Sequence, residues 1–360
     1  MKHHTRDILK INESLKKTQK LIIALGCSYT HGKSAYSQAL LDYKAPIYKD
    51  NTYGYHHYDI ETKKDIANRF PRLELFDEYL CPEDMELDNA YVNVLCSKYL
   101  NNEYTAVNFG IEGCGNYATI SRLFLYPIDY SLAKEIIVIY MPSGMSRFDI
   151  VSDSHEGHLE ISWLDFNTIW PQSEDSLMHD PVMIKNLGRH DTPWNLVQTN
   201  FTKAVMSEKF NVKKSIIDFN ILQNWVKLYS AKLIIFSAFE HVYNKIDFKR
   251  ILETKITRND KTKEFINEEH NKSTEFAEVI DYYINSIPWD NFFNPQNAKS
   301  FHEFSLLQEV AIDKNFDMNL PMQQLVDKRI GSPNLWVMPC GHPSAKAHDL
   351  LAKELLGVIK

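Results

Sequence analysis

The sequence has little of several features that mark specialised protein classes. Its 360 residues include only 5 cysteines and no Cys-x-x-Cys pair, so we expect no disulfide framework and a reducing compartment. No apolar run approaches the ~20 residues of a membrane span, and the charged start, MKHHTRDILKINESLKK, lacks a signal-peptide core. The net charge of −7 argues against nucleic-acid binding through phosphate neutralisation. We therefore expect a cytoplasmic protein with neither a membrane nor a nucleic-acid partner.

What is present is enough apolar material for a large core, because 44% of the residues are hydrophobic. Short apolar runs predict buried strands, and helical patterns lie between them. This alternation predicts an α/β fold with a doubly wound parallel sheet. The expected strands are 21–25, 105–109, 136–141 and 232–239.

The helical patterns begin at residues suited to capping. Asp88 and Asn116 are expected to cap helices, the second of which would end at Pro127. A longer helix is expected to include Ile217, Ile221, Trp225 and Leu228.

Some polar, loop-rich and aromatic segments interrupt this rhythm. We treat the chain, 1–360, as a single domain in which these insertions form a lid or accessory lobe. The insertions are 36–87, 148–212 and 241–330.

A candidate nucleophile lies where the first expected strand ends. The run LIIALGCSYTHG places Ser28 just after Gly26, at the carboxyl end of a strand. Open α/β sheets bind their ligands at that edge. Ser28 and its backbone amide are therefore expected to face a cleft.

A candidate general base lies near the other end of the chain. His342 precedes Pro343 and a helical pattern that runs through Leu351 and Leu355. Proline suits the first turn of a helix, because its missing N–H has no helical partner there. A histidine held beside a docked helix can accept the proton of a serine nucleophile. The alternative interpretation is a surface histidine at a helix cap.

The serine and histidine segments, with two blocks between them, resemble the SGNH, or GDSL-like, hydrolase family. The block VNFGIEGCGN (107–116) is similar to the family's second block, and MPSGMSR (141–147) follows a strand where the third block lies. The resemblance is greatest to the SGNH proteins of bacteriophages and marine bacteria. It implies a three-layer, flavodoxin-like doubly wound sheet with large loop insertions. The similar stretches are 21–35, 89–147, 213–240 and 331–360.

The resemblance implies that Ser28 attacks an ester and that His342 takes its proton. It also implies an oxyanion hole formed by the N–H groups of Ser28 and Gly113. The asparagine that the family carries in its third block is missing. Ser143, or an amide of the 142–146 turn, is one candidate substitute, and Asn116 is the other, with a helix cap as its alternative role.

The family's triad acid is also missing. It would lie three residues before His342, where this chain has Pro339, and the next position is Cys340. Glu240, at the end of the fourth expected strand, is a candidate acid, with a solvent-facing glutamate as the alternative. Without a carboxylate, a Ser-His dyad would act, with a backbone carbonyl orienting the imidazole.

Other residues suggest binding roles. Arg147 is a candidate partner for an acidic substrate group or for a surface ion pair. Cys27, Cys114 and Cys340 fall inside the similar blocks, but they lack the close spacing of zinc ligands, so we expect no metal and no cofactor. Aromatic residues in the insertions suit stacking on a sugar or packing within a lid. They are 48–58, Trp163, Trp170 and Trp194.

These observations predict an SGNH-like esterase acting on a small-molecule or carbohydrate ester, with O-deacetylation as the favoured reaction. The alternative is a catalytically silent SGNH-like binding or structural module, in a viral particle for example. If the protein is viral, its expected location is the host cytoplasm. The sequence does not indicate an oligomeric state.

Overall fold

The structure is a computed structural model of the whole chain. The residues that it describes are 3–32, 35, 89–110, 114–145, 147–152, 165–169, 208–239, 243–253, 255–258, 265–268, 274–314, 336–337 and 342–360.

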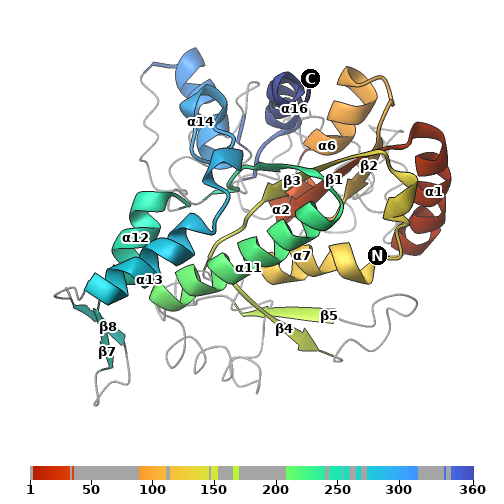
Figure 1. Cartoon of the computed structure of the whole chain (residues 1–360). Helices are drawn as coiled ribbons and strands as arrows, with labels where there is room; N and C mark the ends of the chain where they lie inside the picture. Colours follow the sequence, from red (N-terminus) through yellow and green to blue (C-terminus); the bar gives the residue numbers. More distant parts are fainter. Residues whose placement is uncertain are drawn as a thin grey trace, which may run out of the picture.

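A parallel sheet lies at the centre of the fold (Figure 1). Its four strands run in the order β2-β1-β3-β6, and every neighbouring pair is parallel. In β1 every residue from Leu21 to Gly26 is buried, which explains why this strand is a continuous apolar run. The expected α/β class with a parallel sheet is confirmed. The strands are β1 (Lys20–Gly26), β2 (Thr105–Asn108), β3 (Glu135–Met141) and β6 (Lys232–Ile235).

Helices pack against both faces of this sheet, as Figure 1 shows. Successive side chains of a strand point to opposite faces. Leu21, Ile23 and Leu25 accordingly belong to one apolar cluster, and Ile22 and Ala24 belong to a second. The first cluster includes side chains of α1 (His3–Thr18), α7 (Asn116–Leu125), α11 (Glu208–Leu228), α12 (Lys245–Glu253) and α13 (Thr274–Asn285). The second includes side chains of α6 (Tyr91–Val94), η4 (Leu95–Tyr99), α14 (Phe301–Ile312) and α16 (Ala345–Ile359).

Shorter elements complete the described chain. A one-turn helix, α2 (Ser28–His31), follows β1. Two antiparallel pairs lie outside the main sheet, β4 (Phe148–Ser152) with β5 (Asp165–Ile169) and β7 (Lys255–Arg258) with β8 (Phe265–Glu268). The 3₁₀ turns are η5 (Tyr130–Leu132), η6 (Trp289–Asn291) and η7 (Pro295–Asn297).

Part of the segment expected to form a lid is built into the core. Phe248 and Ile284 are fully buried in the first cluster, and Phe301 and Phe304 are fully buried in the second. The described helices of 241–330 therefore cover both faces of the sheet. The insertion 36–87 lies outside the described residues.

The fourth strand is shorter than expected. It ends at Ile235, but its continuation still donates hydrogen bonds to the chain after β3, from Phe236 N to Tyr140 O and from Ala238 N to Pro142 O. On its other side, this continuation accepts bonds from the start of α14. The expected strand 232–239 thus follows the real path of the chain, although only its first half pairs as a strand.

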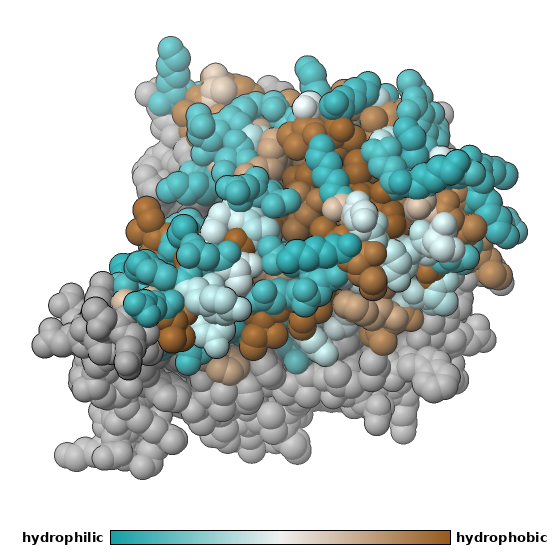
Figure 2. All heavy atoms as spheres, viewed as in Figure 1, coloured by the Kyte–Doolittle hydropathy of each residue, from teal (hydrophilic) through white to brown (hydrophobic). Residues whose placement is uncertain are grey.

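The longer helix expected to include Ile217, Ile221, Trp225 and Leu228 is α11, which contains all four residues. Ile217 and Leu228 are 59% and 73% exposed, whereas Ile216, Phe219 and Leu222 are buried. Trp225 is buried as well, and Ile221 is partly buried against the first cluster, so α11 presents one apolar side to the core. In Figure 2, hydrophilic residues cover much of the described face and hydrophobic residues show between them. Within the described ranges, none of the helices combines the length and apolar character needed to cross a bilayer.

Candidate active site

Two side chains from opposite ends of the chain meet at the carboxyl edge of the sheet. His342 Nε2 lies 2.8 Å from Ser28 Oγ, across a sequence separation of 314 residues. Ser28 is 8% exposed, and His342 is half-buried. This distance is within the hydrogen-bond reach that a nucleophile and its base require. The structure therefore brings together the serine and the histidine that the sequence singles out.

The end of β1 places Ser28 at this edge. Cys27 is the N-cap of α2, so Ser28 is the first residue of the helical turn. In this position its N–H makes no bond within the helix. A Cβ on Gly26 would lie 2.6 Å from Met141 O and would also collide with Thr30 Oγ1. Glycine is therefore required for β1 to turn into α2 so close to β3.

The loop before α16 fixes His342. Pro343 forms an antiparallel bridge with Val337, and Ser344 N donates to Trp336 O. The N-cap of α16 is Ser344, whose Oγ accepts from Ala347 N. The expectation that Pro343 lies in the first helical turn is wrong, because Ser344 caps the helix and leaves the proline outside it. The histidine is still held beside a docked helix, as the sequence predicts.

The loop after β2 is bonded to the turn that carries Ser28. Asn108 Nδ2 donates to Thr30 O at 2.9 Å, and Gly110 N donates to Asn108 Oδ1 at 2.9 Å. His31 Nδ1 lies 3.3 Å from Gly110 O. The first and second similar blocks thus form one connected unit.

Some of the predicted site residues lie outside the described residues. They include the candidate oxyanion donor Gly113 and the candidate acid Glu240. Pro339 and Cys340, at the family's acid position, are outside as well. The same holds for the aromatic residues expected to stack on a sugar, 48–58, Trp163, Trp170 and Trp194.

Asn116 and Ser143, the two candidate substitutes for the missing asparagine, contact each other. Asn116 Oδ1 accepts from Ser143 N at 2.7 Å and from Ser143 Oγ at 3.1 Å. The expected cap role of Asn116 is wrong, because Gly115 is the N-cap of α7 and Asn116 is its first residue. The carboxylate of Asp149 binds the helix start instead, accepting from Gly115 N at 2.7 Å and from Ala118 N at 2.8 Å.

Arg147 lies beside the same loops. Its Nη1 donates to Cys114 O at 3.2 Å, and its guanidinium lies over the ring of Phe239, 5.1 Å from the centroid. A guanidinium on an aromatic face is held by cation–π attraction. These contacts orient Arg147 between the chain after β2 and the chain after β6.

Two of the three cysteines of the similar blocks lie in the described part of the chain, and both are buried among apolar groups. Cys27 and Cys114 are both buried in the second cluster. Burial raises the pKa of the Cys114 thiol well above its ordinary value, and the carboxylate of Asp149 raises it further. A thiol must lose its proton to bind zinc, which this environment opposes. Among the described residues no group of histidines, cysteines and carboxylates is placed to hold a metal ion.

Two residues near the site were not predicted from the sequence. The ring of Tyr29 lies against His342, with 5.1 Å between centroids, and Tyr29 Oη lies 3.4 Å from His302 Nδ1. Tyr29 directly follows Ser28, and this adjacency was a usable signal. His302 lies inside the segment assigned to an insertion, so the sequence carried no signal for it.

Comparisons with known proteins do not add an assignment to this geometry. No protein-family model matches the chain, and searches of curated proteins and of solved structures found no match.

Proposed function

We propose that the protein is a serine hydrolase of the SGNH type that cleaves a carboxylic ester. The observation that carries this proposal is the 2.8 Å contact between Ser28 Oγ and His342 Nε2. A hydroxyl and an imidazole at this distance, at the carboxyl edge of a parallel sheet, form the minimal pair for nucleophilic catalysis.

The proposed fold is the doubly wound, flavodoxin-like one. Starting from β1, the chain adds β2 on one side of this strand and then β3 and β6 on the other, so the order in which strands are added reverses between β1 and β3. Along the chain, α6 between β1 and β2 packs in one cluster, and α11 between β3 and β6 packs in the other. Ligands of such sheets bind where the strand order reverses. Ser28 follows β1 and therefore lies at that point.

In the proposed reaction, Ser28 Oγ attacks the ester carbonyl carbon while its proton passes to His342 Nε2. His342 then gives this proton to the leaving alcohol oxygen as the C–O bond breaks, which leaves an acyl group on Ser28. Water attacks the acyl group, again losing a proton to His342. The carboxylic acid leaves, and Ser28 recovers its proton.

The negative charge on the carbonyl oxygen needs hydrogen-bond donors, each worth ~10²–10³ in rate. The N–H of Ser28 is the first proposed donor, and Gly113 remains the second. The acid partner of His342 remains a prediction, with Glu240 as the candidate and a Ser-His dyad as the alternative. An O-acetylated carbohydrate remains the favoured substrate, and the cytoplasm the expected location.

The test is covalent labelling by a fluorophosphonate probe together with hydrolysis of p-nitrophenyl acetate. The wild-type chain should be labelled at Ser28, and Ser28→Ala should abolish both labelling and turnover. Ser97→Ala is the matched control, since this serine is exposed and its hydroxyl donates to the backbone of the preceding helical turn, at Asn93 O. A folded wild-type chain without labelling would overturn the proposal in favour of a silent binding or structural module.

A further inference from the structure

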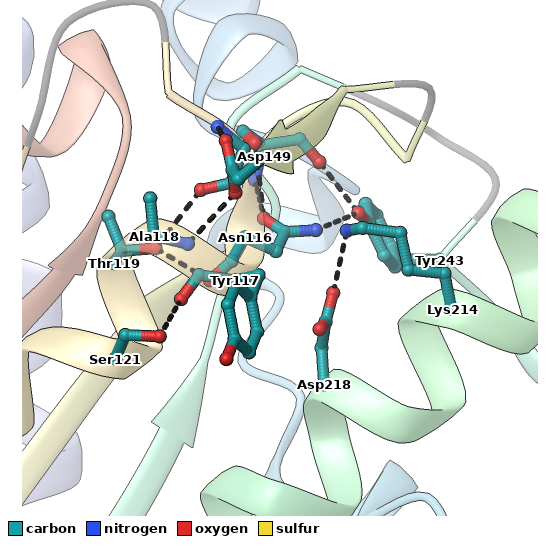
Figure 3. Close-up of polar contacts among 11 residues, drawn as sticks. Asn116, Tyr117, Ala118, Thr119, Ser121, Asp149, Lys214, Asp218 and Tyr243 are labelled. Atoms are coloured by element: carbon teal, nitrogen blue, oxygen red, sulfur yellow. Dashed lines mark hydrogen bonds and ion pairs between the residues drawn. The ribbon is translucent and has the colours of Figure 1, made fainter. Parts of the chain in front are cut away.

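Hydrogen bonds join the first residue of α7, the turn after β3 and the chain before α12 in a closed ring. Figure 3 shows one of these bonds, between Asn116 and Tyr243. Ser143 N donates to Asn116 Oδ1 at 2.7 Å, and Asn116 Nδ2 donates to Tyr243 Oη at 3.0 Å. Tyr243 Oη donates to Ser143 O at 2.6 Å. We refer to Asn116, Ser143 and Tyr243 as the Asn116 ring.

The direction of each bond in the Asn116 ring is determined by chemistry. A backbone N–H can only donate, so Ser143 N must face the carbonyl oxygen of the Asn116 amide. A backbone C=O can only accept, so Tyr243 must give its single proton to Ser143 O. Tyr243 Oη is then left to accept from the Asn116 NH₂ group. All three residues are buried, and burial makes any lost partner costly.

The carboxylate of Asp149 holds the start of α7, which carries Asn116. Asp149 binds Gly115 N and Ala118 N, on either side of Asn116 in the chain. A Cβ on Gly115 would lie 2.6 Å from Asp149 Oδ2, so the carboxylate lies directly against the helix start. The start of α7 cannot shift without losing these bonds. The position of Asn116, and through it that of Ser143, is therefore set by α7.

The Asn116 ring lies beside the helical turn α2, which begins with Ser28. Strands β1 and β3 are neighbours, with Gly26 opposite Met141 in the register. Ser28 and Ser143 each follow two residues after this pair, so the turn that contains Ser143 emerges beside the turn that contains Ser28. Charge that develops after attack by Ser28 needs backbone dipoles held in advance. A functional site must hold such groups within about 0.5 Å of their productive positions.

We propose that Asn116 and Tyr243 are positioning residues for ester hydrolysis. They act through the backbone of Ser143 and hold the turn after β3 in place beside Ser28. This inference rests on the proposed hydrolase function and assigns that reaction two residues that do not touch the reacting atoms. A purely structural role predicts a loss of stability alone, whereas positioning predicts a loss in the rate of the chemical step.

The main test is Tyr243→Phe, which removes the hydroxyl and keeps the aromatic ring of the side chain. This aromatic ring retains its contacts with Phe219 and Phe248, at centroid distances of 6.1 and 6.0 Å. We expect the maximal rate of fluorophosphonate labelling at Ser28 to fall by about 10- to 100-fold, because a misplacement of about 1 Å in the site costs up to ~10²-fold in rate. The probe concentration at half-maximal rate should stay within about twofold of wild type.

The matched control is Tyr130→Phe. Tyr130 is also buried in the first cluster, and its Oη donates to a backbone carbonyl, Leu123 O, at 3.1 Å. Removing this hydroxyl should lower the unfolding temperature by a similar amount and leave labelling unchanged. An equal slowing in Tyr243→Phe and Tyr130→Phe would show that stability alone is responsible, and would overturn the inference.

A second variant keeps the test decisive if Tyr243→Phe does not fold. Asn116→Asp retains the acceptor for Ser143 N but cannot donate to Tyr243 Oη, and it should slow labelling by a comparable factor. Wild-type labelling rates in the folded variants would overturn this inference and leave the hydrolase function standing. Absence of labelling in the wild-type chain would overturn both, so the two failures are distinguishable.

Discussion

The ring of Tyr29 lies against the imidazole of His342, with 5.1 Å between the ring centroids and 44° between their planes. Tyr29 is itself packed against Phe239 and Phe301, at centroid distances of 5.6 and 6.3 Å. Tyr29, which follows the candidate nucleophile, thus packs against one side of the imidazole of the candidate base, His342. An imidazole that packs against an aromatic ring has fewer orientations to search before it can accept a proton.

This relationship predicts different outcomes for two substitutions of Tyr29. Tyr29→Phe keeps the aromatic ring and removes the hydroxyl, with its 3.4 Å contact to His302 Nδ1, and should keep the maximal labelling rate within about threefold of wild type. Tyr29→Leu removes the aromatic ring and should lower the maximal labelling rate by about 10²-fold, with little change in probe affinity. The measurement is the dependence of labelling rate on probe concentration.

The two variants also test the role assigned to the ring. A wild-type rate in a folded Tyr29→Leu protein would show that His342 is oriented without it. An equal loss in Tyr29→Phe and Tyr29→Leu would transfer the role to the hydroxyl and its contact with His302.

Much of the sheet could be predicted because its central strands, β1 and β3, are buried on both faces. Every residue from Leu21 to Gly26 is buried, so the run is apolar without interruption and is easily recognised. Ser28 could be located because it directly follows this run, and His342 because it precedes an amphipathic helix. The contact between them depends on both being at the same edge of the sheet, which the resemblance implied and the α/β alternation favoured.

The residues that hold the edge together could not be predicted in the same way. Asp149 lies in β4, outside the main sheet, and Tyr243 lies in the chain before α12, and their partners are 31 to 127 residues away in the chain. A single polar residue gives no periodic signal, because its burial depends on a partner that folding supplies. The assignment of Asn116 as a cap failed for this reason, since Asp149 took the amides at the helix start.

A second prediction concerns the buried ion pair on α11 (Figure 3). Lys214 Nζ lies 2.9 Å from Asp218 Oδ2, and the two side chains are 10% and 3% exposed. Burial raises the pKa of Asp218 from 3.8 to about 6, and Lys214 opposes this rise. Because the folded-state pKa is the higher one, this carboxylate contributes less to stability as the pH rises from 4 to 6. The pair is therefore expected to stabilise the fold only weakly at neutral pH.

Removing one partner should be worse than removing both. Asp218→Leu leaves a buried ammonium group unpaired and should lower the free energy of unfolding by about 3 kcal/mol. The double variant Lys214→Met with Asp218→Leu should recover most of this loss, or exceed wild type, because neither charge is then desolvated. Urea unfolding at pH 7 measures both. A double variant no more stable than Asp218→Leu would contradict the prediction.

An exposed pair on other helices provides the comparison. Lys249 Nζ and Asp281 Oδ1 are 2.6 Å apart, with side chains 40% and 47% exposed. Water screens such a pair, so Asp281→Asn should change the unfolding midpoint little. A large effect there would show that distance rather than burial decides the cost.

The last prediction follows from His348, which is buried in the first turns of α16. Its Nδ1 accepts a bond from Tyr91 N at 3.2 Å, and its ring is stacked on Tyr91 and meets Phe301 edge to face. Burial lowers the pKa of His348 from 6.5 to about 3, and the charge of His342 lowers it further. Between these values the unfolded chain binds a proton that the folded chain does not. The contribution of this group to stability therefore falls as the pH decreases from 6.5 toward 3, by about 1.4 kcal/mol per pH unit.

The test is His348→Gln, which keeps an acceptor for Tyr91 N but cannot titrate. The free energy of unfolding of both proteins is measured with urea at several pH values from 6 to 4. The free energy of the variant should decline less steeply with decreasing pH, by about 1.4 kcal/mol per pH unit. Comparing slopes removes any constant cost of the substitution. Parallel curves for the two proteins would mean that His348 is protonated in the folded state, against the environment found around its ring.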